Sequence, residues 1–68
     1  MSNGYTLRAA GGGGATVGYE APDDEAAVAV ADLQRRCWGL PLPVKVFRDG
    51  YVVGFVNDRG SFMWRLKS

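Results

Sequence analysis

The dipeptide Asp49-Gly50 constrains the fold more than any other feature of the sequence, because alternating apolar residues precede and follow it. A type I′ turn needs positive φ at both central residues, and Asp-Gly is one of the pairs that adopt it most readily. The sequence therefore predicts a β-hairpin with these two residues as its loop. A regular ladder then gives three cross-strand pairs, which are Arg48 with Tyr51, Val46 with Val53, and Val44 with Phe55.

A second turn centred on Asp58-Arg59 adds a third strand to this hairpin. It predicts three further pairs, which are Val56 with Ser61, Phe55 with Phe62, and Val53 with Trp64. Because side chains alternate between the two faces of a strand, the two turns assign every residue to a face. The face that we expect to be covered carries Val44, Val46, Tyr51, Val53, Phe55, Phe62, Trp64 and Leu66. The opposite face carries Lys45, Phe47, Val52, Gly54, Val56, Ser61, Met63, Arg65 and Lys67.

The first twenty residues predict another hairpin. Tyr5–Ala9 and Ala15–Glu20 alternate as strands do, and the four glycines Gly11–Gly14 between them favour a loop. The glycine run lacks the spacing of a phosphate-binding motif. A connection of odd length, or a bulge, brings the apolar side chains of both strands to one face, and we predict this connection. Its expected pairs are Leu7 with Tyr19 and Ala9 with Val17.

A helix is expected over Asp24–Trp38, opened by three consecutive carboxylates, Asp23-Asp24-Glu25, and ended by Gly39. We expect Trp38 to lie as a lid over the edge of the sheet, with an exposed anchor as the alternative. The residues Leu40–Pro43 form a stiff connection to the next strand. The apolar stripe of the helix is predicted to consist of Ala26, Ala29, Val30, Leu33 and Cys37.

These elements predict one domain over residues 1–68 in the order ββαβββ. The expected fold class is α+β, with a single antiparallel sheet and one helix packed on one of its faces. A chain of 68 residues with ten glycines buries a small core, so it has little material with which to cover both faces of the sheet.

The composition excludes most kinds of catalytic site. The sequence has no histidine and a single cysteine, Cys37, so neither a zinc or haem site of the usual kind nor an internal disulfide is expected. Consecutive carboxylates on a first helical turn diverge around the axis, so we expect Asp23, Asp24 and Glu25 to cap the helix rather than to hold a metal. We therefore expect a protein that is not an enzyme and that needs no cofactor.

The sequence contains no apolar run of about 18 residues and does not begin like a secretory signal, so we expect a soluble cytoplasmic protein without membrane partners. Charge is divided along the chain: residues 1–34 carry a net −4 and residues 35–68 a net +5. This division gives two candidate binding surfaces. The first is an acidic patch of Glu20, Asp23, Asp24 and Glu25. The second is the open sheet face with Lys45, Phe47, Val52, Val56, Met63, Arg65 and Lys67.

Three uses of the open face remain. A protein partner would bind Phe47 and Met63 as apolar anchors, with basic residues selecting an acidic rim. A nucleic acid would stack a base on Phe47 and place phosphates on Lys45, Arg65 and Lys67. Alternatively, the face pairs two copies in a homodimer or is an ordinary solvated surface. We expect the protein partner, because a net charge of +1 is low for a nucleic-acid-binding domain.

The layout resembles the small single-domain anti-CRISPR proteins of phages and mobile elements. The matching segments are the hairpin Tyr5–Glu20, the alanine-rich helix Asp24–Trp38 and the hairpin Val44–Val56. This resemblance implies an inhibitor in the host cytoplasm that binds a subunit of a CRISPR surveillance complex, or its nuclease, and blocks target DNA engagement. Many members of the group mimic DNA with a strongly acidic surface, whereas this chain has a net charge of +1. Either the acidic patch or the sheet face would then carry the binding.

Overall fold

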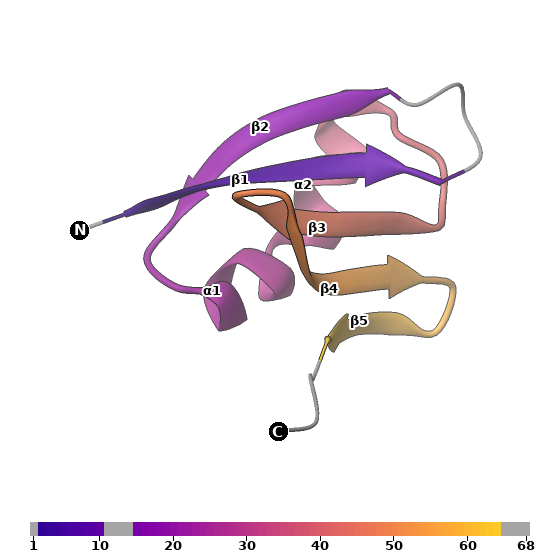
Figure 1. Cartoon of the computed structure of the whole chain (residues 1–68). Coiled ribbons are helices and arrows are strands. Elements are labelled where there is room, and N and C mark those ends of the chain that lie inside the picture. Colours follow the sequence, from indigo (N-terminus) through magenta and orange to yellow (C-terminus); the bar gives the residue numbers. More distant parts are fainter. Residues whose placement is uncertain (1, 11–14, 65–68) are drawn as a thin grey trace.

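The computed structural model describes residues 2–10 and 15–64, which form a five-stranded antiparallel sheet with two short helices on one face (Figure 1). This arrangement confirms the α+β fold class. The elements are β1 (Asn3–Ala9), β2 (Thr16–Ala21), α1 (Asp24–Ala29), α2 (Ala31–Trp38), β3 (Val44–Arg48), β4 (Tyr51–Asn57) and β5 (Gly60–Met63).

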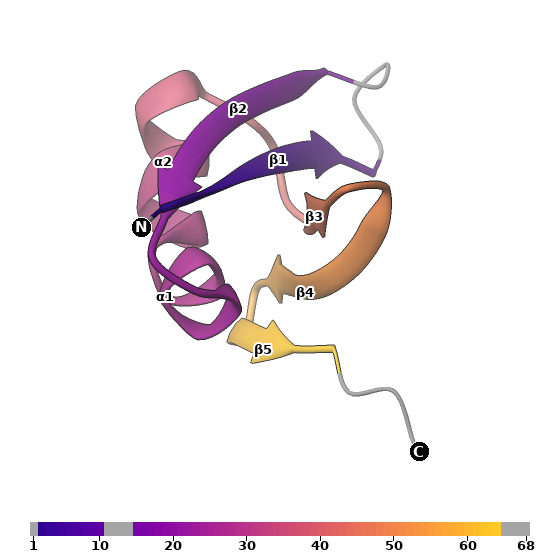
Figure 2. The same cartoon turned by 60° about the vertical axis from the view of Figure 1, so that its left-hand side comes forward.

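The strands lie in the order β2-β1-β3-β4-β5, so β2 and β5 form the two edges of the sheet. The chain leaves β2 at one edge, passes through both helices and returns as β3, which pairs with β1 in the middle. Figure 2 shows the helices on one side of a strongly twisted sheet, with β5 at its lower edge. Within the described residues, the helices therefore cover one face, and no other element covers the opposite face, which we call the open face.

The N-terminal hairpin has a different register from the predicted one. Leu7 pairs with Val17 and Tyr5 with Tyr19, which is a shift of two residues. The Ala9 amide donates to the Ala15 carbonyl oxygen at 3.1 Å, so the connection has the predicted odd length. A shift of two keeps each side chain on its predicted face. The predicted glycine loop, residues 11–14, lies outside the described residues.

The predicted helix is divided into α1 and α2 at Val30. It begins as expected, because Asp23 is the N-cap and its side chain accepts a hydrogen bond from the Ala26 amide at 2.8 Å. It also ends as expected, at Gly39, whose φ of 69° is the left-handed conformation that favours glycine. Beyond this end, the Leu40 amide donates to the Arg35 carbonyl oxygen at 2.8 Å.

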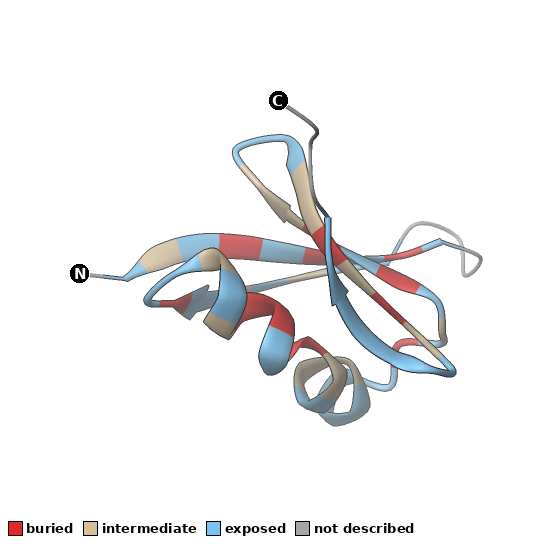
Figure 3. Ribbon diagram, turned by 90° about the horizontal axis from the view of Figure 1, so that it is seen from below, coloured by how far each residue is buried: buried red, intermediate tan, exposed pale blue. Residues whose placement is uncertain are grey.

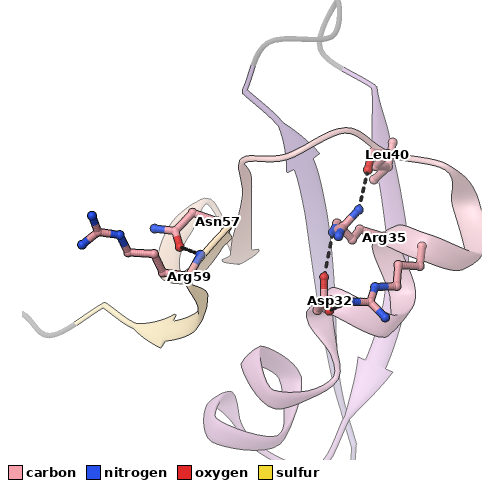
Figure 4. Close-up of polar contacts among 6 residues, drawn as sticks. Asp32, Arg35, Leu40, Asn57 and Arg59 are labelled. Atoms are coloured by element: carbon pink, nitrogen blue, oxygen red, sulfur yellow. Dashed lines mark hydrogen bonds and ion pairs between the residues drawn. The ribbon is translucent and has the colours of Figure 1, made fainter.

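Arg35 connects the body of α2 to the chain that follows it (Figure 4). Its Nε donates to Asp32 Oδ1 at 2.7 Å, and its Nη1 donates to the Leu40 carbonyl oxygen at 3.5 Å. Asp32 Oδ2 also accepts from Arg36 Nη2 at 2.9 Å, the i,i+4 pair expected on an exposed helix face. These contacts fix the end of α2 where the chain turns toward β3.

The predicted apolar stripe of the helix is mostly wrong, since Ala26 is the one of its five residues that packs against the core. The residues that α1 and α2 bury are Ala27, Val28 and Ala31, whereas Leu33 is 60% exposed and Cys37 is also exposed. The preferred position of Trp38 as a lid is wrong as well, since this side chain is 64% exposed. The helices approach the sheet closely through Ala27, Val28 and Ala31, and the larger side chains of Leu33 and Trp38 lie on the outside. The prediction assigned the helix face by the helical spacing of apolar residues, and this spacing pointed to the wrong side.

The β3–β4 hairpin follows the predicted register only near its turn. Asp49 and Gly50 have φ of 51° and 85°, as a type I′ turn requires. Beyond the turn, β4 contains a bulge at Val53. The observed pairs are Arg48 with Tyr51, Phe47 with Val52, Val46 with Gly54, Lys45 with Phe55, and Val44 with Val56.

Because of this single extra residue, every later side chain of β4 and β5 lies on the face opposite to the predicted one. The register of the β4–β5 turn is confirmed, with Val56 opposite Ser61 and Phe55 opposite Phe62. Val44 and Val46 lie under the helices as expected, but Gly54 and Val56 lie there with them. The bulge accordingly moves Phe55, Phe62 and Trp64 from the predicted covered face to the open face.

The core lies between the sheet and the helices, as the alternation of buried and exposed residues along the strands shows (Figure 3). Its largest fully buried side chains are Leu7, Val44, Val46 and Val56. Tyr5 and Tyr19 extend the core toward α1, and their ring centroids are 5.9 Å apart. The small number of large side chains indicates a modest hydrophobic stabilisation for the domain.

Candidate interaction surface on the open sheet face

One cross-strand row on the open face joins two cations to two phenylalanines. Arg8 of β1 pairs with Lys45 of β3, Lys45 pairs with Phe55 of β4, and Phe55 pairs with Phe62 of β5. Residues directly opposite one another share a face, with Cβ atoms about 4.5–5.5 Å apart. The sheet therefore presents a continuous row that is basic at one end and aromatic at the other.

Three rings form the aromatic end, and we call Phe55, Phe62 and Trp64 the aromatic cluster. The Phe55 and Phe62 rings are stacked with centroids 5.4 Å apart, and the Trp64 ring meets Phe55 edge-on at 6.3 Å. The Trp64 amide donates to the Val53 carbonyl oxygen at 3.0 Å, which holds Trp64 beside β4. Trp64 is 51% exposed and Phe62 is 42% exposed. Exposed aromatic groups of this kind are typical of interaction surfaces.

The basic end of the row contains a cation–π contact. The Arg8 guanidinium carbon lies 5.5 Å from the centroid of the Phe47 ring, within the distance at which the ring quadrupole attracts a cation. Lys45 lies between Arg8 and the aromatic cluster and is exposed. Together these residues place two positive charges beside apolar rings on one surface.

Trp64 and Val52 separate two shallow depressions. One has a volume of about 240 Å³ and is lined by residues that include Lys45, Phe55 and Pro43. Most of the surface they present to it is apolar. The other has a volume of about 350 Å³ and extends toward Asp24, Arg48 and Tyr51. The pockets that hold small molecules usually have volumes of about 300–1,000 Å³ and enclose the ligand. These open hollows suit side chains that project from a macromolecular partner.

The predicted sheet-face residues are only partly brought together. Lys45, Phe47 and Val52 lie on the open face as expected. The placement of Val56 is wrong, because it is fully buried under the helices. The placement of Met63 is also wrong, since it pairs with Gly54 on the helix face and remains partly exposed only at the edge. Arg65 and Lys67 lie outside the described residues.

Sequence reasoning missed Arg8 and the whole aromatic cluster. The rings were assigned to the covered face because a regular ladder was continued past residue 53. One signal in the sequence marked the irregularity: an isolated glycine inside a strand favours a bulge or a close approach of another element, and Gly54 shows both. Arg8 was missed because the pairing of β1 with β3 joins segments that are distant in the sequence.

The predicted acidic patch is largely committed to internal contacts. Asp23 caps α1, as described above. Asp24 Oδ1 accepts a hydrogen bond from the Tyr5 hydroxyl at 2.7 Å and lies 3.3 Å from Arg48 Nη1. Glu20 and Glu25 are exposed. Asp23 is exposed as well but holds the cap, so Glu20 and Glu25 are the exposed carboxylates of the patch that make no contact with the helix backbone.

The tyrosines beside this patch are held in their neutral form. Burial raises the pKa of Tyr5, and the hydrogen bond to Asp24 raises it further. Burial also raises the pKa of Tyr19 to about 12, with a smaller contribution from Tyr5. The Tyr19 hydroxyl donates to the Ala27 carbonyl oxygen at 2.6 Å, which ties β2 to α1. Both hydroxyls thus serve the packing of the helix layer against the sheet.

A second apolar surface lies on the helices, away from the sheet. Val30, Leu33 and Cys37 recur at helical spacing, and all three are exposed together with Trp38. These are the larger side chains of the stripe that the sequence assigned to the core. They provide a matched surface against which the open sheet face can be tested.

Among residues 2–10 and 15–64, there is no group of three or more acidic, cysteine or histidine side chains that could hold a metal ion. Neither α1 nor α2, the helices of the described chain, has the length and apolar character needed to cross a membrane.

The chain matches no protein-family model, and neither the curated proteins nor the solved structures include a match to it.

Proposed function

We propose that this chain is a non-catalytic protein-binding domain and that the open sheet face with the aromatic cluster is its binding surface. The observation that carries the proposal is the exposure of Phe62 and Trp64 on the same sheet face as Lys45 and Arg8. Aromatic side chains and arginine are enriched in the buried centres of protein interfaces. The broad, twisted surface and its shallow hollows suit a macromolecule better than a small substrate.

The charges on this face favour a partner whose contact surface is acidic at its rim. Arg8 and Lys45 would meet that rim while the aromatic cluster enters apolar hollows of the partner. The resemblance in layout to small anti-CRISPR proteins makes a CRISPR surveillance complex, or its nuclease subunit, the first partner to test. In this proposal the chain acts as an inhibitor that occupies a surface needed for target DNA engagement.

A nucleic-acid-binding module is the second candidate. The observation that favours it is the contact of Arg8 with Phe47, because stacked rings beside cations can hold a single strand by its bases and phosphates. A net charge of +1 favours the protein partner, since nucleic-acid-binding domains are usually more basic. Glu20 on the edge strand β2 adds a repulsive charge to the same sheet.

The binding test compares two double variants that remove the same chemistry from different surfaces. Lys45→Ala with Trp64→Ala changes the open face, and Arg36→Ala with Trp38→Ala removes the same two kinds of side chain from the exposed helix surface. Binding to purified surveillance complexes and nuclease subunits is measured by biolayer interferometry. We expect the sheet-face variant to raise Kd at least about tenfold, because exposed aromatic anchors carry much of the energy of an interface. We expect the helix variant to bind as the wild type does.

Two further experiments separate binding by the open face from binding by the acidic patch and from binding to nucleic acid. Glu20→Lys with Glu25→Lys tests the acidic patch without removing the internal contacts of Asp23 and Asp24. Loss of binding in this variant, with the sheet-face variant unaffected, would contradict the proposed surface. Titration of single-stranded oligonucleotides at several salt concentrations tests the second candidate. Tight binding that weakens steeply with salt, without binding to any protein subunit, would replace the protein partner by nucleic acid.

A further inference from the structure

Among the described residues, the outer edge of β5 pairs with no other strand, which leaves a defined set of backbone groups along it. Trp64 donates its amide inward to Val53, and Phe62 lies opposite Phe55 in the same ladder. Backbone groups alternate in direction along a strand, so the amide and carbonyl groups of Ser61 and Met63 point away from β4. These groups form the outer rim of the sheet.

Within the described residues, this edge lacks most of the devices that usually prevent strands from associating, and its one protective feature is the shortness of β5, at four residues. Folded proteins protect sheet edges with lysine, proline, inward-pointing charges or covering elements. The segment Gly60–Trp64 contains no charged residue and no proline, and all five residues are exposed. The opposite edge, β2, contains Glu20 and an internal glycine, Gly18, both of which weaken strand pairing. Of the two edges, β5 is therefore the better template for an added strand.

We propose that β5 pairs with β5 of a second copy of this chain in an antiparallel arrangement, which joins two sheets into one of ten strands. The register follows from the outward groups. Ser61 of each copy pairs with Met63 of the other, which satisfies all the outward amide and carbonyl groups of both residues. The two-fold axis then passes between the two Phe62 side chains. The strand is thus complementary to itself, as a two-fold interface requires.

The side chains support a second copy rather than an unrelated strand. At the axis, Phe62 faces Phe62 on the open face, and aromatic pairs across strands are stabilising. The Met63 side chains, partly exposed at the edge on the helix face, would be covered from the other copy. The dimer would merge two aromatic clusters into one surface, and it stands independently of the proposed function.

Disulfide trapping tests this register directly. In a Cys37→Ser background, which removes the exposed native thiol, Phe62→Cys places two thiols at a pair that is not hydrogen-bonded, where Cα atoms lie about 4.5 Å apart. This separation falls within the range of ordinary disulfides. Diamide removes two electrons and two protons from the thiol pair to form the bond. We expect a cross-linked dimer within minutes for Phe62→Cys and at least tenfold slower for the control Ser61→Cys, which faces Met63 instead of itself.

The unmodified chain provides the second measurement. Sedimentation equilibrium is expected to give twice the monomer mass of 7.3 kDa at high concentration and a decreasing mean mass on dilution. Met63→Lys is expected to shift the mass to that of the monomer, and Tyr51→Lys, at an exposed site on β4, is expected to leave the dimer intact. A wild-type monomer at all concentrations up to about 1 mM would overturn the proposal, as would equal cross-linking of both cysteine variants. Protection of the Ser61 and Met63 amides from exchange only after a different protein is added would assign the edge to a foreign strand instead.

Discussion

Gly54 of β4 lies directly against the Val28 side chain of α1. A Cβ added at Gly54 would collide with one methyl group of Val28 and with the Phe62 carbonyl oxygen at 2.8 Å, and it would lie 3.1 Å from the other methyl group. Glycine is therefore required at the point where the helix layer approaches the sheet most closely. The same glycine follows the bulge at Val53, so the close approach and the bulge are parts of one local arrangement.

Gly54→Ala is expected to destabilise the domain by about 2 kcal/mol, because the added methyl group overpacks a contact that includes backbone atoms. Urea unfolding followed by circular dichroism measures the change. Gly18→Ala is the matched control on β2, where the nearest atom to an added Cβ is the Tyr5 carbonyl oxygen at 3.9 Å. The control is expected to stay within about 1 kcal/mol of wild type. Equal losses in the two variants would contradict the close contact at Gly54.

The helix orientation is tested by two substitutions within one turn of α2. Leu33→Ala is expected to change the free energy of unfolding by less than about 0.5 kcal/mol, because Leu33 is mostly exposed. Ala31→Leu is expected to destabilise by about 1–3 kcal/mol, because Ala31 is fully buried against the sheet. Thermal unfolding of both variants provides the comparison. A large loss in Leu33→Ala with a neutral Ala31→Leu would restore the helix face that the sequence pattern favoured.

The N-cap residue of α1, Asp23, is expected to make a measurable contribution to the free energy of unfolding. Asp23→Ala removes the acceptor for the Ala26 amide and is expected to cost about 1 kcal/mol. Asp23→Asn keeps an acceptor at the same place and should restore most of the stability. Glu25→Ala changes an exposed carboxylate in the same turn and serves as the control. If all three variants unfold at the same urea concentration, the cap contributes nothing to stability.

The tyrosine pair predicts how stability depends on alkaline pH. An unfolded tyrosine loses its proton near pH 10, whereas the raised pKa of Tyr19, about 12, keeps its folded form neutral to higher pH. The unfolded state therefore releases protons first, and the stabilisation present below pH 10 is lost between pH 10 and 12. Tyr5, whose pKa is also raised, acts in the same direction.

Unfolding midpoints measured between pH 9 and 12 for wild type, Tyr19→Phe and Tyr51→Phe isolate this effect. Tyr19→Phe is expected to lose the hydrogen bond to the Ala27 carbonyl oxygen and to show a smaller decline with pH. Tyr51→Phe, at an exposed position, should decline as wild type does. Parallel curves for wild type and Tyr19→Phe would show that Tyr19 ionises alike in the folded and unfolded states.

Local chemistry explains which parts of the fold could be predicted from the sequence. The turn at Asp49-Gly50, the β4–β5 turn and the end of the helix at Gly39 each depend on a few neighbouring residues with specific backbone requirements. In the β4–β5 turn, the Asn57 side chain accepts a hydrogen bond from the Arg59 amide at 2.8 Å (Figure 4). Such contacts lie within a few residues of sequence and leave a recognisable pattern.

Which residues of β4, β5 and the helices point toward the core could not be predicted in the same way, because this depends on how the helix layer packs against the sheet. A regular ladder placed Phe55 and Trp64 under the helices, but Ala27, Val28 and Ala31 lie close against that face of the sheet and leave no room for rings. The bulge at Val53 resolves this conflict by turning the rings to the open face. The surface that we propose for binding thus arises from the packing that excluded its residues from the core.

The most direct test of the account is a set of nuclear Overhauser effects from the aromatic rings in the labelled chain. We predict cross-peaks of Phe55 ring protons with Trp64 and with Lys45, and none with the Val28 or Ala31 methyl groups, which lie on the other side of the sheet. Cross-peaks from Phe55 or Trp64 to those methyl groups would show that the rings lie beneath the helices. That result would remove both the open aromatic surface and the function proposed for it.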